Sequence, residues 1–428
     1  MIMKASSLLA SIVCSALVAT SEGTLTTEYL AANGLNFTCT VLKHDAKDAG
    51  APVKKVMLLH GFPMFRVWWQ PLLEHWDKLF VSLNQPDDSA VIKNLIKLID
   101  SEDDSTIFTT GLHAVACDLR GYSPGASPDD MVQYDYSIFA QDTFALAQAA
   151  GFDEGFHLLG HDHGAALAWY IAANDPDSMV QSLTTLSVPH IGLMSDALCG
   201  DNADQEQVIA SNYFNQFSLP SSATRNNASL TQVFQNFGFD IGPAQFQKML
   251  WWYHGSLAKY FSMPRVVSDA EVDAFEAENG PEAAFFVKAA RSAIPMEERP
   301  CTPIDDQDKV LAIEIPTLFI CGVNDVALLC NKPYVSNFSP DLLPNYEHAN
   351  FECGHDFFLQ GNCDGMDTSR AVMEKITAFV FSDNDQGETT SARGSSGTTT
   401  SNTLKLTKGL PLALILGGAM MAYYSVLM

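Results

Sequence analysis

The chain has 428 residues, of which 47% are hydrophobic, so it can bury a sizeable core in one large domain or in two or three smaller ones. Its formal net charge of −26 argues against nucleic acid and anionic lipid headgroups as partners, because both are themselves negatively charged. Acidity of this extent is typical of a solvated surface and does not by itself indicate a site.

The N-terminal segment, residues 1–21, is typical of a secretory signal peptide. Lys4 is its only charge, an apolar run covers Leu8–Val18, and small residues follow. The run is too short to favour a membrane span. Three N-glycosylation sequons fit a secreted chain, at Asn36, Asn227 and Asn337.

Residues 26–190 predict a hairpin followed by alternating strands and helices, with an acidic insertion at 84–111 whose role stays open. The predicted strands are Thr26–Asn33, Leu35–Lys43, Val56–Leu59, Ala114–Cys117, a short run before Asp162, and Leu183–Val188. The predicted helices are Trp68–Leu83, Tyr136–Ala150 and the apolar segment after Asp162. Such alternation gives right-handed βαβ units and a largely parallel sheet, with active residues at the carboxyl ends of the strands.

The stretch Gly160-His161-Asp162-His163-Gly164 joins a short buried strand to an apolar helix. Its glycines allow a sharp turn of the kind that carries a nucleophilic serine in some hydrolases. The positive end of the following helix keeps the Asp162 carboxylate ionised, so it can attack a saturated carbon and form an ester. A polar turn or a run of metal ligands is the alternative. Because consecutive side chains of a strand point to opposite faces, we do not expect a shared metal ion.

Residues 191–300 predict a helical cap inserted into the sheet domain. Amphipathic helices with aromatic faces are expected over Gln205–Phe217 and Gln245–Phe261, and Ser268 begins a capping box before a third helix. Residues 301–381 then restore the sheet domain. Its elements are a strand at Pro316–Gly322, a strand that runs to His355 and a helix over Arg370–Phe381.

The C-terminal end predicts a stalk and a membrane-attachment signal. Residues 382–408 are rich in Ser, Thr and Gly and show no helical or strand period. Residues 409–428 are apolar and uncharged, and the small residues at 394–397 precede a polar spacer, as in a glycosylphosphatidylinositol (GPI) signal. A transmembrane anchor is the alternative. Both place the protein at a membrane on the cell surface or outside the cell.

The sequence contains nine cysteines, and eight remain if Cys14 leaves with the signal peptide. An even number fits an oxidising compartment. Cys117 and Cys321 lie in apolar strand-like runs, so we expect them to be free buried thiols. Cys199 and Cys301 flank the predicted cap at its entry and exit, so we expect a disulfide between them. Connectivity among the others stays open.

Five motifs in this order resemble the α/β-hydrolase superfamily, specifically its epoxide hydrolase and dehalogenase branch. They are His60-Gly61-Phe62-Pro63, Asp118-Leu119-Arg120-Gly121-Tyr122-Ser123, Gly160-His161-Asp162-His163-Gly164, Gly322-Val323-Asn324-Asp325 and Cys353-Gly354-His355. The resemblance covers about Thr26–Phe381 apart from the insertion. It implies the α/β-hydrolase fold, a mostly parallel central sheet flanked by helices with an inserted helical cap, and it implies no metal or cofactor.

The resemblance also implies roles for single residues. Asp162 would be the nucleophile, His355 the base and Asp325 the acid that orients the histidine, with Asn324 as a minor alternative to Asp325. The backbone N–H groups of Phe62 and His163 would form the oxyanion hole. In this branch the residue after the nucleophile is usually Trp or Arg, and His163 matches neither.

On the substrate side, Tyr213 matches the first of two cap tyrosines that donate a proton to an opening epoxide. Phe285 and Phe286 lie where the second is expected, and Tyr253 or Tyr260 could substitute. Trp69 and His161 are further candidates for substrate contact.

The sequence therefore predicts a hydrolase that acts through an aspartyl alkyl ester on a small hydrophobic organic substrate. Epoxide hydrolysis is the first interpretation, and dehalogenation of small haloacids or haloalkanes is the second. A non-catalytic surface binding protein on the same fold is the alternative from another class. Loss of Asp162, Asp325 or His355 would indicate such a binding protein, and the sequence keeps all three.

Overall fold

A computed structural model describes residues 24–83, 110–219, 241–303 and 312–382, except for 49, 202, 255–257, 282, 285–286, 289–296, 337–338 and 360. The predicted signal peptide, nearly all of the acidic insertion, the stalk beyond residue 382 and the C-terminal tail lie outside these residues, as do Asn227, Asn337, Phe285 and Phe286. Among the described residues, no helix combines the length and the apolar character needed to cross a bilayer.

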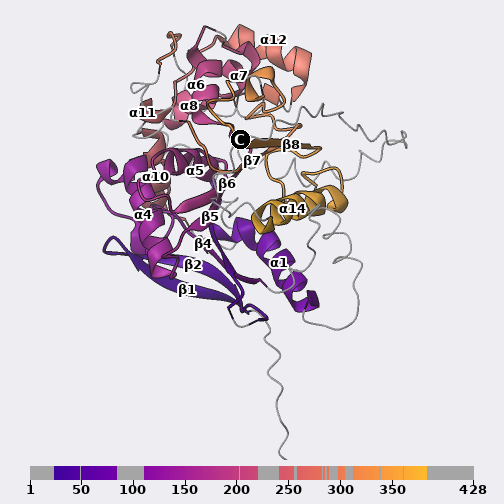
Figure 1. The fold of residues 1–428 in the computed structure, drawn as a ribbon. Helices are drawn as coiled ribbons and strands as arrows, with labels where there is room; N and C mark the ends of the chain where they lie inside the picture. The colour runs from indigo at the N-terminus through magenta and orange to yellow at the C-terminus, as the bar shows by residue number, and fades with distance from the viewer. Residues whose placement is uncertain are drawn as a thin grey trace, which may run out of the picture.

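An eight-stranded sheet forms the centre of the molecule, in the order β1-β2-β4-β3-β5-β6-β7-β8 (Figure 1). The strands are β1 (Thr24–Ala32), β2 (Leu35–His44), β3 (Val53–Leu59), β4 (Gly111–Cys117), β5 (Phe156–His161), β6 (Val180–Leu186), β7 (Thr317–Gly322) and β8 (Tyr346–Phe351). β1 and β2 pair antiparallel with each other and β2 with β4, whereas all pairs from β4 to β8 are parallel. The predicted hairpin is confirmed, and its turn residues Asn33 and Gly34 both have positive φ, as a two-residue hairpin turn requires.

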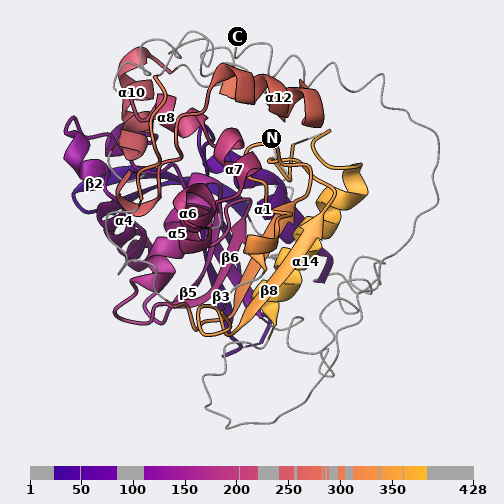
Figure 2. The ribbon, with the colours of Figure 1, turned by 90° about the horizontal axis from the view of Figure 1, so that it is seen from above.

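Helices cover both faces of this sheet (Figure 2). α1 (Gln70–Leu83) and α14 (Met366–Phe381) pack on one face, and α4 (Tyr136–Ala149) and α5 (His163–Ala173) pack on the other. Every residue of β5 and β7 is buried, because each strand contacts a helical layer on both sides. This arrangement explains the continuous apolar runs in the sequence and confirms the predicted fold class.

The chain between β6 and β7 forms further helices, of which α6, α7, α8 and α12 gather at the top of Figure 1. They are α6 (Ile191–Cys199), α7 (Gln205–Ala210), α8 (Tyr213–Phe217), α10 (Pro243–Trp252), α11 (Ala258–Tyr260) and α12 (Asp269–Asn279). The helix expected over Gln205–Phe217 is in fact two short ones, α7 and α8. At the break between them, Asn212 donates its side-chain N–H to the carbonyl of Arg265, 2.7 Å away. The capping box at Ser268 is present.

Disulfides join the cysteines after Cys14 in four pairs. They are Cys39–Cys117, Cys199–Cys301, Cys321–Cys330 and Cys353–Cys363. The bridge expected across the cap hinge is confirmed, with its Cα atoms 5.6 Å apart. The expectation of free thiols at Cys117 and Cys321 is wrong. The strand register sets Cys39 of β2 directly opposite Cys117 of β4, and the loop after β7 returns Cys330 to Cys321.

A buried ion pair connects the hairpin turn to α4. Arg120 donates from Nε and Nη2 to the two carboxylate oxygens of Asp142, each at 2.7 Å, and Asn33 donates to Asp142 Oδ1 at 2.8 Å. The side chains of Arg120 and Asp142 are only 3% and 5% exposed. Removal of the carboxylate would leave a guanidinium buried without its counter-ion.

Asp142→Ala should therefore lower the free energy of unfolding by about 3–5 kcal/mol. Denaturant unfolding with the disulfides intact measures this change. Asp129→Ala is the matched control, because Asp129 is 96% exposed in its ion pair with Lys248 and should contribute less than about 1 kcal/mol. Equal losses in the two variants would contradict the assignment.

Candidate active site

The turn between β5 and α5 holds Asp162 in a backbone conformation that only a few per cent of non-glycine residues adopt, with φ 52° and ψ −122°. The flanking glycines are sterically required. A Cβ at Gly160 would lie 2.3 Å from the carbonyl oxygen of Gly164, and a Cβ at Gly164 would lie 2.2 Å from that of Leu59. The glycine spacing in the sequence thus reflects close packing around a strained nucleophile position.

The Asp162 carboxylate lies among hydrogen-bond donors. The backbone N–H of Phe62 donates to Oδ1 at 2.6 Å, and that of His163 donates to the same carboxylate. His355 Nε2 lies 3.4 Å from Oδ2. Burial alone would raise the pKa of Asp162, but His355, His161 and the His163 N–H more than offset it and lower the pKa to about 2. The carboxylate is therefore ionised at neutral pH.

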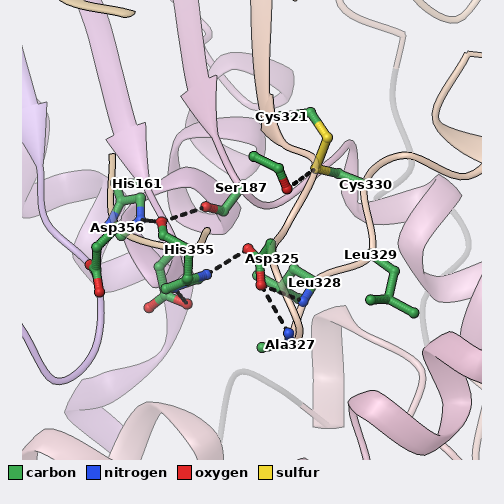
Figure 3. A network of polar contacts seen from close by, with 12 residues as sticks. His161, Ser187, Cys321, Asp325, Ala327, Leu328, Leu329, Cys330, His355 and Asp356 are labelled. Atoms are coloured by element: carbon green, nitrogen blue, oxygen red, sulfur yellow. Dashed lines mark hydrogen bonds and ion pairs between the residues drawn. A yellow bond between two sulfur atoms is a disulfide. The ribbon is translucent and has the colours of Figure 1, made fainter. Parts of the chain in front are cut away.

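Asp325 holds the histidine in one orientation. Its Oδ2 lies 2.7 Å from His355 Nδ1, and its Oδ1 accepts the backbone N–H groups of Ala327 and Leu328 at 2.9 and 3.0 Å (Figure 3). Burial acts to lower the pKa of His355, but Asp325 and Asp162 together raise it well above 6.5. The resting site thus contains an imidazolium between two carboxylates, with Nε2 directed at Asp162.

His161 supports the loop that carries His355. Its Nε2 donates to the His355 carbonyl at 2.9 Å, and Ser187 Oγ donates to the same carbonyl at 3.2 Å (Figure 3). The ring stacks on Trp68, with centroids 3.8 Å apart, and Trp68 Nε1 donates to Asp356 at 3.0 Å. His161 does not line the pocket described next, so its contacts are those of a positioning residue.

A pocket opens beside Asp162 between the sheet domain and the helices that follow β6, and its lining includes Tyr213 and Tyr253. Tyr213 is the first residue of α8, and Tyr253 directly follows α10. Burial raises the pKa of both phenols well above 10, and for Tyr253 the neighbouring Tyr213 adds to the rise. Both hydroxyls are therefore protonated and can donate.

The other aromatic candidates lie elsewhere. Tyr260 donates to Asp135 at 2.7 Å and is not part of the pocket lining. Trp69 is fully buried in the cluster that α1 and α14 share, also outside the lining. Ala284 and Val287, on either side of the expected second tyrosine, are buried in a separate cluster with α7 and α12. Tyr253 thus provides the second phenol from a different segment.

Two short disulfide loops carry two members of the triad. Cys321–Cys330, with a sequence separation of 9, closes the loop that contains Asp325 (Figure 3). Cys353–Cys363, with a separation of 10, closes the loop that contains His355. The acid and the base are therefore each held in a covalently closed loop.

Replacing Cys353 and Cys363 together by Ser should lower kcat by roughly 10- to 100-fold, because misplacement of a catalytic group by about 1 Å has an effect of this size. Steady-state kinetics measures the loss, and circular dichroism checks that the fold remains. The same change at Cys39 and Cys117, which lie outside both triad loops, is the control. A loss of equal size there would attribute the effect to general destabilisation.

Comparison with known proteins identifies the family of this chain. A family described as alpha/beta hydrolase fold matches residues 54–362. "Epoxide hydrolase 3" of Xenopus tropicalis is 33% identical over 113 residues, covering 26% of this chain and 29% of the relative. "Epoxide hydrolase 4" of Homo sapiens is 26% identical over 175 residues, covering 41% of this chain and 38% of the relative. The matches thus span about a third of the length of these two relatives.

Among solved structures, one described as novel epoxide hydrolases of the alpha/beta hydrolase superfamily, from metagenomes of hot environments, has a TM-score of 0.52 to this chain. It is 19% identical and covers 83% of this chain and 99% of that one, so it shows the shared fold. The family match extends over more than half of the chain and includes every member of the triad. The chain belongs to the alpha/beta hydrolase fold family.

Proposed function

We propose that the protein hydrolyses epoxides of small hydrophobic organic molecules to diols, through an ester between the substrate and Asp162. One observation carries this proposal: a single pocket is lined by Asp162, whose carboxylate is buried and ionised, and by Tyr213 and Tyr253, whose hydroxyls are neutral. The carboxylate supplies the nucleophile, and the hydroxyls supply the proton that the opening ring needs.

In the first step, Asp162 Oδ2 attacks a ring carbon while Oδ1 stays on the N–H of Phe62. The carbon–oxygen bond of the ring breaks, and its oxygen takes a proton from Tyr213 or Tyr253. The product is a hydroxyalkyl ester whose carbonyl oxygen, Oδ1, already lies in the oxyanion hole. No rearrangement of the donors is needed before the second step.

Ester formation allows His355 to act as the base. Asp162 loses its negative charge, so one of the two carboxylates that raise the pKa of His355 disappears. The imidazolium then gives up its proton by way of solvent and restores the tyrosine hydroxyl. Neutral His355 accepts a proton from the water that attacks the ester carbonyl. Release of the diol regenerates the Asp162 carboxylate and the imidazolium. Each group therefore returns to its starting protonation state after one cycle.

The two phenols favour epoxides over organohalides as substrates. An epoxide oxygen leaves as an alkoxide that must be protonated, whereas a halide ion leaves without a proton. Tyr213 and Tyr253 both remain protonated in the pocket, as the first reaction requires.

We further propose that the protein acts in the secretory pathway or outside the cell, attached through its C-terminal tail. Disulfides at all eight cysteines after Cys14 support an oxidising compartment, and Asn36 is exposed at the start of β2. Release from intact cells by phosphatidylinositol-specific phospholipase would distinguish a lipid from a transmembrane anchor.

Multiple turnovers in heavy-oxygen water should label the peptide that contains Asp162, because water attacks the aspartyl carbonyl and one carboxylate oxygen leaves with the diol. Peptide mass spectrometry measures the label. His355→Gln should accumulate an alkyl-enzyme visible in the intact mass, whereas Asp162→Ala should form no adduct. Turnover of an epoxide without label in that peptide would refute the ester mechanism.

Tyr213→Phe and Tyr253→Phe should each leave measurable epoxide opening, because one phenol remains in either variant. The double variant should lose a further factor of about 10²–10⁴ in kcat, the usual contribution of a general acid. Tyr260→Phe is the control, since Tyr260 bonds to Asp135 outside the pocket. Full activity in Tyr253→Phe together with complete loss in Tyr213→Phe would show that Tyr253 is no donor.

A further inference from the structure

The ring of His163 is buried, and the described part of the chain provides no hydrogen-bond partner for it. The residue is 1% exposed, and neither Nδ1 nor Nε2 is bonded to any described residue. The ester chemistry uses only its backbone N–H. Buried polar groups are nearly always paired, because an unpaired one destabilises the fold. The two ring nitrogens therefore indicate a partner that the described residues do not provide.

Two further unpaired polar groups surround this ring. His163 stacks on Trp252, with centroids 3.7 Å apart and planes at 11°, and lies 5.7 Å from the ring of Tyr136. Trp252 Nε1 and the Tyr136 hydroxyl are also buried without a partner among the described residues. We call these three residues the His163 cluster. His163 and Trp252 line the pocket together with Asp162, so two of the three residues lie at the pocket that contains the carboxylate.

The charge state of the cluster limits what it can bind. Burial lowers the pKa of His163 to about 3, so the ring is neutral and offers one N–H donor and one acceptor nitrogen. Trp252 Nε1–H offers a second donor. A hydroxyl group matches this set, because it accepts from one neighbour and donates to another. An alkyl group would leave every polar group of the cluster unpaired, and the negative charge of Asp162 would repel a carboxylate.

We infer that the His163 cluster is a subsite for a hydroxyl group beside the epoxide ring, so that the preferred substrates are epoxy alcohols. The inference rests on the proposed epoxide hydrolysis and adds its substrate class. The hydroxyl accepts from Trp252 Nε1 and donates to the acceptor nitrogen of His163, and it fixes which face of the epoxide ring meets Asp162.

A matched pair of substrates tests this subsite. In 2-(hydroxymethyl)oxirane and 2-ethyloxirane, a hydroxyl and a methyl group occupy the same position, so only the hydrogen bonds differ. The wild type should favour the alcohol in kcat/KM by at least about tenfold, as sites built to bond a hydroxyl do. In His163→Phe, which keeps an aromatic ring against Trp252, this ratio should fall close to one. Trp252→Phe should lower it partly, because one donor is lost.

The ratio of the two substrates is the readout, so a general loss of activity in a variant does not affect it. An equal preference in the wild type, or a preference that persists in His163→Phe, overturns the subsite while leaving epoxide hydrolysis in place. If the wild type converts neither epoxide, the proposed function fails. A binding titration with glycerol and butane-1,2-diol then tests the subsite independently of any reaction. Tighter binding of glycerol that His163→Phe abolishes supports it, and equal binding overturns it.

Discussion

The strained backbone at Asp162 is the constraint on which the site depends. A conformation of this kind costs about 1–3 kcal/mol and persists only where the surrounding packing fixes it. Gly160 and Gly164 provide that packing, because no larger residue fits against the neighbouring carbonyls. Because the backbone fixes the position of the carboxylate, the residues that contact it must be positioned by neighbouring elements. The ends of β3, β7 and β8 bring Phe62, Asp325 and His355 to one point, as expected for the carboxyl edge of a parallel sheet.

The sheet and the cap contribute different chemistry to this point. In the proposed mechanism, the sheet supplies the nucleophile, the base and the oxyanion hole from strand ends, whereas the cap supplies neutral donors from helix ends. Tyr213 begins α8, and Trp252 and Tyr253 lie where α10 ends. Tyr213, Trp252 and Tyr253 all line the pocket. The cap can therefore set substrate preference without altering the groups that make and break the ester.

The sequence was sufficient to predict the sheet and the positions of Asp162 and Asp325, because each follows a recognisable buried strand, and it placed His355 after the last strand of the sheet. It was insufficient for features that depend on distant parts of the chain. Tyr253 lies in an aromatic helical segment, and periodicity cannot distinguish a pocket side chain from a core one. The break near Asn212 depends on the carbonyl of Arg265, and the pairing of Cys117 depends on the register of β2 against β4.

The bond between Cys39 and Cys117 has a consequence for how the protein behaves at high concentration. Its two cysteines join the antiparallel hairpin β1–β2 to β4, whose residues are nearly all buried. If the hairpin detached, β4 would become an open apolar edge, which is a template for strand addition by another copy of the chain. The covalent link keeps this edge covered even when the hydrogen bonds of the hairpin open. The disulfide therefore opposes self-association through the edge of β4.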